Sequence, residues 1–303
     1  MELLTSCHVA TTIVTLKAFG DFLIAYSALL RSNAINSAAD IQLLAGEHVR
    51  PLGLALGVSD AQVHYIGGSS LKDVPAAFDA RRRGLWAACR SMAALRRAVH
   101  DTQPAHRHLV FDRLGPRELF ISGGRPRLAL PREAPNIYLA YDAHFLAGAP
   151  PASHLEVASG TRRAVIVPAS RVPRKVLPRE VIAQVHQQLA DRGVKAQVLL
   201  LEGEQVEVPQ FVDLVRVPRE FSALMTSLRE TDIVVSADSL PAHIGEHLGK
   251  PTFVISPTPN PYWLPRAAFL RGGHGVFDNL GNLNPWLEQL QADSRLIHVE
   301  GLL

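Results

Sequence analysis

The sequence has 303 residues, of which 47% are hydrophobic and 19% are charged, and its formal net charge at pH 7 is +3. This composition is that of an ordinary globular protein and excludes an intrinsically disordered chain. The length favours two domains that share a cleft, with one large barrel as the alternative. The small net charge gives no basis for nucleic-acid binding, because no basic block is longer than Arg81–Arg83. It is compatible with phosphorylated sugars or an anionic lipid surface.

The two cysteines, Cys7 and Cys89, lie far apart in sequence and form no C-x-x-C pair. We interpret both as reduced thiols, buried or half-buried, in a cytoplasmic protein. The N-terminus lacks a positively charged segment followed by a long apolar core. No run approaches the roughly 18 uncharged apolar residues of a membrane span. We therefore expect neither secretion nor a membrane-spanning helix.

The first half of the chain alternates short apolar runs with amphipathic ones. Apolar and β-branched runs predict four strands, at Val9–Leu16, Ile41–Leu44, Val63–Ile66 and His108–Asp112. Helical spacing predicts three helices, at Asp21–Arg31, Pro75–His100 and Asn136–Leu146. In the second helix we expect arginines on the wet side and an apolar face made of Phe78, Leu85, Trp86, Ala88 and Leu95.

Pro150–Gly160, with its proline pair, serines and terminal glycine, is the best linker candidate. We therefore expect an N-terminal domain of residues 1–152 and a C-terminal domain of residues 161–303. Strands are predicted beyond the linker at Ala164–Val167, Ala196–Leu201, Leu214–Val217, Ile233–Ser236 and Thr252–Ser256. Helices are predicted between them at Pro178–Arg192 and Ser222–Arg229. This rhythm indicates parallel sheets covered by helices on both faces.

The stretch Asp238–His243 follows the apolar run Ile233–Val235 and reads as a turn that starts a helix. The first turn of a helix has unpaired N–H groups and a partial positive charge, so such a corner is suited to phosphate. Asp238 or Ser239 can cap this helix, and Pro241 suits its first turn. Capping alone is the simpler interpretation of the corner.

The spacing of this corner resembles the D-(S/T)-G-x-x-H motif of the ADP-heptose:lipopolysaccharide heptosyltransferases, glycosyltransferase family nine. Ala18–Leu23 is similar to that family's strand–loop–helix element with its G-D step. Val165–Arg171, followed by Lys175–Pro178, is similar to its T-(S/T)-R-x-x-K-x-W-P segment. Three motifs in order over roughly 240 residues are far more specific than one. The resemblance implies a GT-B architecture, in which two Rossmann-like parallel-sheet domains face each other across a cleft.

The sequence departs from the family pattern at four points. Leu240 stands where the family has glycine, Ser27 where a proline is usual, and Leu177 where the family has tryptophan. One extra residue separates Arg171 from Lys175. The change at Leu240 matters most, because a glycine lets the backbone approach a diphosphate closely. Either the donor binds slightly differently in this chain, or catalysis is weakened.

The resemblance implies an inverting sugar transfer, in which a carboxylate takes the proton of the acceptor hydroxyl. It assigns this role to Asp21, whose alternative is to complement the helix dipole. It also implies that Lys175 binds the leaving diphosphate, with Ser170 as a hydroxyl donor beside it. Arg174 competes with Lys175 because of the extra residue, and either cation could instead be a solvated loop residue.

Glu204 and Phe221 lie roughly where the family recognises the nucleoside, through the ribose hydroxyls and the face of the base. Glu202 is an equal candidate for the carboxylate. Alternatively, Phe221 belongs to the core and both glutamates are exposed loop residues. The donor-binding set that the resemblance implies is Ser170, Lys175, Glu204, Phe221, Asp238, Ser239, Leu240 and His243.

His243–His247 also matches H-x-x-E-H, the inverted zinc-peptidase pattern, which places two imidazoles on one helix face. The predicted helix is barely two turns long and contains Gly245, which argues against metal binding. We interpret His243 as a hydrogen-bond donor toward the diphosphate or the sugar, and His247 as a surface or packing residue. We expect no metal cofactor, because no acidic metal cluster is visible.

Basic residues offer a second candidate surface. Arg81–Arg83, together with Arg125, Arg127 and Arg132, could contact an acidic acceptor such as a Kdo-bearing lipid. A solvated helix face or loop is the favoured alternative for all of them.

Our first interpretation is a metal-independent, inverting glycosyltransferase of the heptosyltransferase type, acting in lipopolysaccharide biosynthesis. The resemblance implies a nucleotide-diphospho-sugar donor, ADP-heptose, and a cell-surface glycan or lipid precursor as the acceptor. It implies a cytoplasmic location and leaves peripheral contact with the inner membrane open. The second interpretation, suggested by Leu240 and Ser27, is a degenerate GT-B protein that binds a nucleotide or a partner without turnover. The third is a zinc hydrolase.

Overall fold

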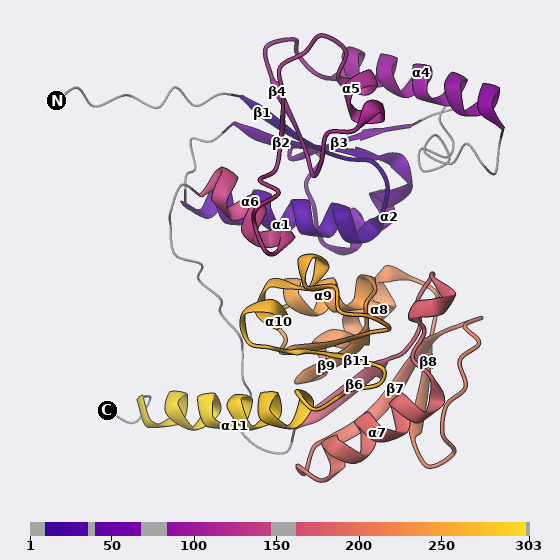
Figure 1. Ribbon diagram of the computed structural model, residues 1–303, viewed down its shortest axis with the longest axis vertical. Helices are drawn as coiled ribbons and strands as arrows, with labels where there is room; N and C mark the ends of the chain where they lie inside the picture. Colours follow the sequence, from indigo (N-terminus) through magenta and orange to yellow (C-terminus); the bar gives the residue numbers. More distant parts are fainter. Residues whose placement is uncertain (1–9, 36–39, 68–83, 147–161, 301–303) are drawn as a thin grey trace. The chain divides into compact units, whose positions relative to one another are not determined.

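The computed structural model describes residues 10–35, 40–67, 84–146 and 162–300, with the side chains of residues 35 and 293–300 left out. The chain forms two compact units (Figure 1). Unit 1 comprises Met1–Ala134 and Tyr138–Ala149, and unit 2 comprises Pro135–Ile137 and Pro150–Leu303. The linker candidate Pro150–Gly160 lies outside the described residues, so the expected boundaries at residues 152 and 161 stay a prediction. No helix in the described part of the chain is long and apolar enough to span a membrane.

Unit 1 contains a parallel sheet of five strands in the order β3-β2-β1-β4-β5. The strands are β1 (Thr11–Thr15), β2 (Ile41–Gly46), β3 (Val63–Ile66), β4 (His108–Phe111) and β5 (Arg127–Ala129). All five residues of β1 are buried, and Thr11 of this strand pairs with Ile41 of β2 and with His108 of β4. A strand buried on both faces suits the β-branched sequence Thr-Thr-Ile-Val-Thr, because branched side chains pack well on a pleated surface.

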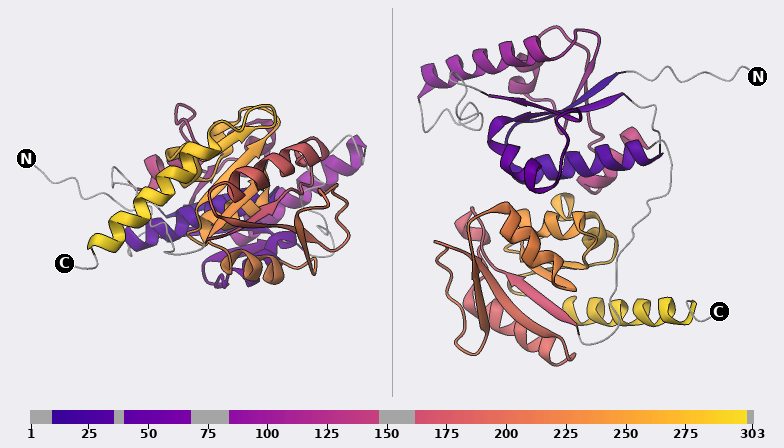
Figure 2. Two further views of the ribbon diagram at one scale, coloured as in Figure 1. Left: turned by 90° about the horizontal axis from the view of Figure 1, so that it is seen from below. Right: turned by 180° about the vertical axis from the view of Figure 1, so that it is seen from behind.

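Helices cover both faces of this sheet (Figures 1 and 2). The helices α4 (Leu85–Thr102) and α5 (Pro116–Ser122) lie on one face, and their side chains Leu95, Val99 and Ile121 pack against the strands. The other face carries α1 (Phe19–Ile35), a short turn η1 (Glu47–Val49), α2 (Arg50–Ala55) and α6 (Ile137–Phe145).

Unit 2 contains a second parallel sheet, of six strands in the order β11-β10-β9-β6-β7-β8. The strands are β6 (Arg163–Val167), β7 (Lys195–Leu201), β8 (Asp213–Val217), β9 (Ile233–Ala237), β10 (Thr252–Ser256) and β11 (His274–Val276). The helical elements are η3 (Pro173–Lys175), α7 (Arg179–Ala190), α8 (Phe221–Arg229), α9 (Leu240–His247), η4 (Pro261–Trp263), α10 (Arg266–Leu270) and α11 (Leu283–Glu300).

The larger core of unit 2 lies under α7 and α11, on the face of the sheet opposite α8, α9 and α10 (Figure 1). Leu177 is 1% exposed and belongs to this core, so a leucine fills a packed position where the family pattern has tryptophan. On the other face, α9 lies so close to the sheet that a Cβ atom on Gly245 would be 2.5 Å from Thr252 Oγ1. Glycine at residue 245 therefore permits this close packing.

The structure corrects two expectations about α4. Ala88 and Leu95 are buried as expected, but Leu85 is 72% exposed and Trp86 is 87% exposed. Phe78 and the expected first part of this helix lie outside the described residues. Cys89 is exposed rather than buried or half-buried, because it lies beside the solvent face of α4, and Cys7 lies outside the described residues.

Candidate functional site

Both sheets have a point where the order of connections reverses, and the predicted site residues other than Glu204 and Phe221 lie near these two points. In unit 1 the chain runs from β1 outward to β3 and then returns to β4 on the other side of β1. In unit 2 it runs from β6 outward to β8 and returns to β9 on the other side of β6. Open parallel sheets bind ligands beyond the carboxyl ends of the strands at such a switch point.

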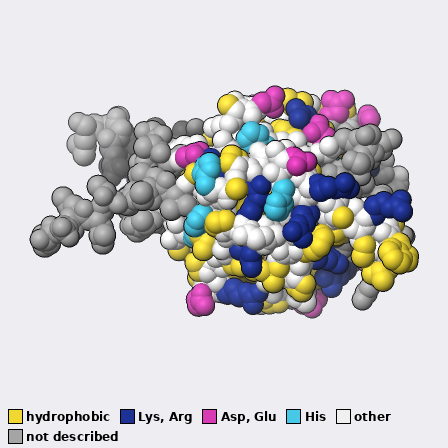
Figure 3. All heavy atoms as spheres, turned by 90° about the horizontal axis from the view of Figure 1, so that it is seen from above, with side chains coloured by type: hydrophobic (Ala, Val, Ile, Leu, Met, Phe, Trp, Pro, Cys, Tyr) yellow, Lys and Arg dark blue, Asp and Glu magenta, His cyan; other side chains and the backbone are white. Residues whose placement is uncertain are grey.

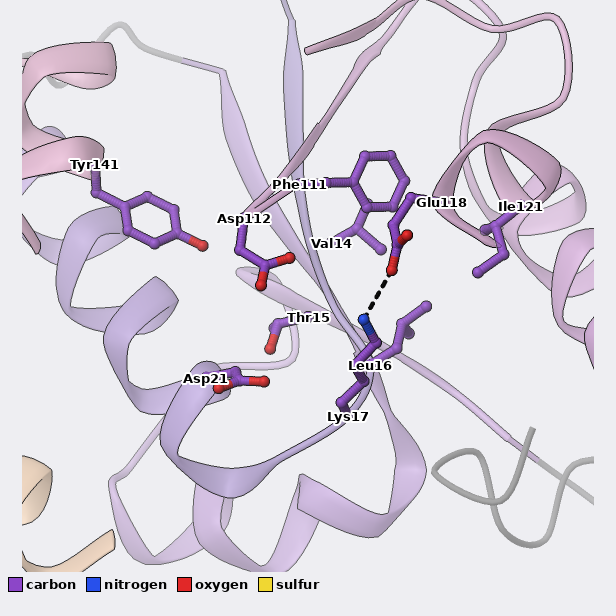
Figure 4. Close-up of a pocket in the computed structure, with 10 residues that line it drawn as sticks. All are labelled: Val14, Thr15, Leu16, Lys17, Asp21, Phe111, Asp112, Glu118, Ile121 and Tyr141. Carbon is purple, nitrogen blue, oxygen red and sulfur yellow. Dashed lines mark hydrogen bonds and ion pairs between the residues drawn. The ribbon is translucent and has the colours of Figure 1, made fainter. Parts of the chain in front are cut away.

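At the switch point of unit 1 a pocket lies between the ends of β1 and β4 (Figure 4). Asp21, in the first turn of α1, and Asp112, directly after β4, both line it. Thr15, the last residue of β1, also lines the pocket. Figure 4 shows the carboxyl groups of both aspartates and the hydroxyl group of Thr15 pointing into one space, with Tyr141 nearby.

The hydroxyl group of Thr15 is buried and is therefore expected to form a hydrogen bond. Thr15 is 5% exposed, and its Oγ1 atom has no hydrogen-bond partner among the described residues. Buried hydroxyl groups in native proteins nearly always have a protein or water partner, so an orphan that faces a pocket suggests a bound polar group. A substrate hydroxyl or a water molecule would satisfy it.

The charged side chains that line the pocket are mostly acidic. Lys17 Nζ donates to Glu118 Oε1 at 2.7 Å, and Glu118 Oε2 accepts the backbone N–H of Gly115. Burial raises the pKa of Glu118, but the hydrogen bond and charge of Lys17 and the backbone N–H groups together bring this pKa below its ordinary value. Lys17 of the pocket lining is thus engaged by Glu118, and two further acidic side chains, Asp21 and Asp112, line the same pocket.

Asp112 is a functional candidate that our sequence interpretation missed. Burial raises the pKa of its carboxyl group, while Lys17 and the backbone N–H of Arg113 oppose this shift. A carboxyl group with a raised pKa in a pocket is a typical candidate for proton transfer. The available signal was its place as the last residue of the predicted strand His108–Asp112, since side chains at that end of a parallel strand reach the switch point.

At the switch point of unit 2, Lys175 and Asp238 form an ion pair. Lys175 ends η3, which follows β6, and Asp238 follows β9. Lys175 Nζ lies 2.7 Å from Asp238 Oδ2, and both side chains are largely buried. Both cations of this loop belong to η3: Lys175 pairs with Asp238, whereas Arg174 is exposed.

The predicted corner at Asp238 folds as a strand followed by a helix, but neither expected side chain caps α9. Ser239 is the N-cap residue and makes no capping hydrogen bond; its hydroxyl donates instead to the carbonyl groups of Ala169 and Ala237. Pro241 lies in the first turn, as predicted. Leu240 is the first helical residue and is partly exposed. The first-turn N–H groups of α9 are therefore not occupied by a side-chain cap.

His243 is buried in α9, 6% exposed. Burial lowers its pKa to about 4; Asp238 opposes this shift and Lys175 adds to it. The imidazole is therefore neutral at pH 7 and offers one N–H donor rather than a positive charge.

The remaining donor-site candidates are held by local contacts. Ser170 Oγ accepts the backbone N–H of Val172 at 3.3 Å. Glu204 Oε2 accepts the backbone N–H of Leu201 at 2.9 Å, whereas Glu202 is exposed. Phe221 is the first residue of α8 and is partly exposed, so it is not a fully buried core residue. Glu204 and Phe221 follow β7 and β8, at the same edge of the sheet as Lys175.

The arginines that we considered for an acidic acceptor have other contacts. Arg125 donates to the carbonyl oxygens of Gln103 and His100, and Arg127 donates to that of Gly123. Arg132 is exposed, and Arg81–Arg83 lie outside the described residues. Arg125 and Arg127 thus have a structural role in binding backbone carbonyl groups, which neither the acceptor hypothesis nor the solvated alternative predicted.

The zinc pattern has no support in the described part of the chain. Glu246 Oε2 accepts the backbone N–H of Ala267. Burial lowers the pKa of His247 as well as that of His243. Within the described residues, no group of three or more His, Cys, Asp or Glu side chains could hold a metal ion.

No family model and no curated protein matches this sequence. Solved structures do match its fold. Heptosyltransferase WaaC of E. coli, solved with ADP-2-deoxy-2-fluoro heptose, aligns over 94% of this chain and 99% of its own at a TM-score of 0.55 and 14% identity. E. coli ADP-heptose lps heptosyltransferase II aligns over the same fractions of the two chains, at a TM-score of 0.56 and 14% identity. The glycosyl transferase family 9 structure from Veillonella parvula DSM 2008 aligns over 88% of this chain and 84% of its own, at a TM-score of 0.55 and 14% identity.

These similarities confirm the expected fold class, two Rossmann-like parallel-sheet domains of the GT-B kind. They also confirm the expected resemblance to family nine at the level of fold. At 14% identity they show the fold alone.

Proposed function

We propose that this chain, which has the GT-B fold of the family-nine glycosyltransferases, transfers a sugar from a nucleotide-diphospho-sugar donor to a hydroxyl group. The observation that carries the proposal is the position of the three sequence motifs. The segment with Asp21 meets the switch point of unit 1, and the segments with Lys175 and Asp238 meet that of unit 2. Chemistry-bearing residues thus lie where this class of sheet binds ligands.

In this proposal unit 2 binds the donor. Lys175 supplies positive charge to the leaving diphosphate, and the uncapped N–H groups of α9 add to it. The ion pair with Asp238 keeps Lys175 in place until the diphosphate competes for it. Ser170 and His243 provide hydrogen bonds, and Glu204 and Phe221 recognise the nucleoside.

Unit 1 binds the acceptor in the pocket at Asp21. A carboxylate that takes the proton of an acceptor hydroxyl makes that oxygen a better nucleophile, and attack from the face opposite the diphosphate inverts the sugar. Asp21 is the proposed base, with Asp112 as the competing candidate. The hydroxyl of Thr15 offers a hydrogen bond to the same acceptor group.

The finer parts of the proposal are a heptose as the sugar, ADP as the nucleotide and a lipopolysaccharide precursor as the acceptor. They are supported by the motif resemblance and by the ADP-heptose analogue bound to the similar WaaC structure. We further propose a cytoplasmic location and a reaction that needs no metal.

The test has two steps. First, thermal unfolding is measured with ADP, UDP, GDP and dTDP, because a ligand that binds only the folded state raises the unfolding temperature. We expect one diphosphate, ADP, to stabilise the wild-type protein and to lose this effect in Lys175→Ala. Second, the matching nucleotide-heptose is incubated with deacylated lipopolysaccharide precursors and the products are analysed by mass spectrometry. Absence of binding by every diphosphate would refute the proposal.

A second function is favoured by one observation, the side chain of Leu240 at the start of α9. In this case the chain binds a nucleotide without turnover. Stabilisation by a diphosphate, combined with no transfer from any nucleotide-heptose, would select this alternative.

A further inference from the structure

The pocket at the switch point of unit 1 has an acidic lining, although the chain as a whole is basic. Among the described residues that line the pocket, Asp21, Asp112 and Glu118 carry carboxyl groups and Lys17 carries an ammonium group. The whole chain has a formal net charge of +3 at pH 7. Figure 3 shows one outer face of the molecule, on which Lys and Arg side chains lie among Asp, Glu and His side chains. The acidic lining is therefore a local feature that does not follow from the composition of the chain.

Local structure holds Lys17 against Glu118. Glu118 lies in the first turn of α5, and its Oε2 atom accepts the backbone N–H of the N-cap residue Gly115 at 3.1 Å. Its Oε1 atom accepts a hydrogen bond from Lys17 Nζ at 2.7 Å, and the Glu118 side chain is only 7% exposed. A ligand that drew Lys17 away would leave a buried carboxylate without its cation, which is strongly unfavourable. Lys17 is therefore not available to an anionic ligand.

Asp112 reaches the same pocket from the end of β4. Its Oδ1 atom accepts the backbone N–H of Arg113 at 2.9 Å. Burial raises the pKa of Asp112, because the charged form loses hydration, and the positive charge of Lys17 opposes this shift. A second cation in the pocket would stabilise the charged form of Asp112 further. The pocket thus favours a ligand with a positive charge over one with a negative charge.

Thr15 adds a hydrogen-bonding group to this space. Thr15 is 5% exposed, and its Oγ1 atom has no hydrogen-bond partner among the described residues. Figure 4 shows this hydroxyl pointing into the same space as the carboxyl groups of Asp21 and Asp112. Apolar side chains, among them Val14 and Phe111, complete the lining, and charges interact more strongly beside such walls than in water. A ligand with a cation and a hydroxyl group side by side would satisfy both kinds of group.

We propose that the acceptor carries a protonated amino group beside the hydroxyl group that receives the sugar, as an amino sugar does. Asp112 binds the ammonium group, Thr15 binds the hydroxyl group, and Asp21 takes the proton of that hydroxyl group. A protonated amine has no free electron pair, so the hydroxyl oxygen remains the nucleophile. This inference rests on the proposed function, in which unit 1 binds the acceptor, and it adds the chemical class of that acceptor.

The experiment compares three methyl glycosides that share one ring and differ in charge. They are methyl glucosaminide, which is cationic, methyl glucoside, which is neutral, and methyl glucuronide, which is anionic. Saturation-transfer NMR titrations of the full chain, without a donor, give the dissociation constants at about pH 6.5, where the amine is protonated. We expect the glucosaminide to bind roughly tenfold more tightly than the glucoside, and the glucuronide roughly tenfold more weakly, because charges interact strongly in a partly buried site.

Two substitutions test the assigned contacts. Asp112→Asn keeps the shape of the side chain but removes its charge, so the preference for the glucosaminide over the glucoside should fall to roughly threefold or less. Glu118→Gln releases Lys17 and should strengthen binding of the glucuronide roughly threefold or more. Asp213→Asn is the matched control, because it removes an exposed carboxylate of β8 in unit 2 and should change none of the three constants. Thermal unfolding of each variant verifies its fold.

Four results would overturn the inference. Three of them are equal affinities for the three glycosides, tighter binding of the glucuronide, and no binding of any glycoside. The fourth is a preference for the glucosaminide that persists unchanged in Asp112→Asn, because the ammonium group would then bind elsewhere. The donor test separates this inference from the proposed function. If no nucleoside diphosphate binds while the expected ranking of the glycosides holds, sugar transfer is refuted and the amine-binding site in unit 1 stands.

Discussion

The two aspartates of the unit 1 pocket differ in the evidence that identifies them as candidates. Asp21 is predicted by its motif, whereas Asp112 emerges only because β4 ends beside β1. Both face the pocket, and burial raises the pKa of Asp112. A carboxyl group with a raised pKa is a candidate for proton transfer, so Asp112 competes for the role of the base. Asp21 is our proposed base because its segment matches the motif.

We expect Asp21→Asn to lower sugar transfer by about 100-fold or more, because general base catalysis commonly contributes roughly 10² to 10⁴. Asparagine keeps the size and hydrogen bonding of the side chain but cannot accept the proton. Donor affinity should hardly change, since we assign Asp21 to the acceptor side. Asp112→Asn is the matched control and should reduce transfer less. If the larger loss occurs in Asp112→Asn, the roles of the two aspartates are exchanged.

Lys175→Ala should weaken nucleoside-diphosphate binding by about 1.5 to 3 kcal/mol, the range for a charge-assisted hydrogen bond. Binding is measured by calorimetry. The same substitution leaves Asp238, which is mostly buried, without its cation, so a moderate loss of stability is expected as well. Arg174→Ala is the control, because Arg174 is exposed and lies next to Lys175 in the loop. Unchanged affinity in both variants would remove this loop from the donor site.

His243 should make the fold sensitive to acid. Its pKa in the folded protein, about 4, lies below the ordinary value of 6.5, so the folded state prefers the neutral ring. This stability is fully present above pH 6.5 and is lost as the pH falls toward 4. We expect a loss of about 2 to 3 kcal/mol from this group. Urea unfolding at pH 7 and pH 4.5 measures it.

The control for this effect is the exposed His106. The difference in unfolding free energy between the two pH values should shrink in His243→Gln and persist in His106→Gln. An unchanged difference in His243→Gln would assign the acid sensitivity to other groups.

At the scale of single elements, the backbone at the start of α9 shows whether the leucine at residue 240 acts through its side chain or through backbone strain. Leu240 is the first residue of a regular helix, and its neighbour Ser239 has extended backbone angles (φ −156°, ψ 179°). A helical residue does not need the backbone freedom of glycine. The leucine at the first helical position therefore acts through its side chain and not through backbone strain.

Leu240→Gly should raise nucleoside-diphosphate affinity roughly three- to tenfold, because phosphate can then approach the helix N-terminus. The variant should lose up to about 1 kcal/mol of stability, the usual effect of glycine in a helix. Leu240→Ala should recover most of the affinity, since the side chain rather than the backbone is the obstacle. Titration calorimetry compares the three proteins. Equal affinities would show that the leucine side chain does not limit donor binding.

The helix α1 explains the second departure from the family pattern. Ser27 is buried in the middle of α1, which runs without interruption from Phe19 to Ile35. A proline inside a helix removes a backbone hydrogen bond and kinks it. Serine therefore preserves a continuous helix here, and Ser27 by itself gives no reason to expect lost catalysis.

The elements that the sequence predicts are those with a strong pattern of their own. Each expected strand is present, because buried central strands such as β1 and β9 carry uninterrupted apolar or β-branched runs. The strands β5 and β11 were not predicted. Each has three residues and lies at an edge of its sheet, where pairing with the neighbouring strand rather than its own sequence defines it.

At the scale of the whole molecule, the two units share one sheet topology. In each, the chain leaves a central strand, builds one half of the sheet and returns to the other side of that strand. The polar residues to which we assign a chemical role lie at these two switch points. The nucleoside contacts, which follow β7 and β8, are the exception. The same geometry thus supplies two binding sites from sequences that do not repeat each other.

We expect the whole protein to be indifferent to metal removal. The charge of the leaving diphosphate is met in our proposal by Lys175, Ser170 and the start of α9. Treatment with EDTA should therefore change neither the thermal unfolding temperature nor sugar transfer, and elemental analysis should show no stoichiometric metal. Stoichiometric zinc whose removal abolishes function would instead favour the hydrolase interpretation based on His243 and His247.

The sequence alone determined the alternation of strands and helices, the two-domain organisation and the three motifs, because each depends on residues that are close in the chain. It also determined that the corner at Asp238 starts a helix with Pro241 in its first turn. Local spacing and backbone preference are sufficient for such features.

Only the tertiary structure decided which side chains meet. Asp112 lies 91 positions from Asp21, and Asp238 lies 63 positions from Lys175, so no local pattern brings either pair together. Strand order does so, by placing β4 beside β1 and β9 beside β6. Exposure was decided in the same way: Trp86 fits an apolar helix pattern, yet it faces solvent because the sheet contacts only the Ala88, Leu95 and Val99 side of α4.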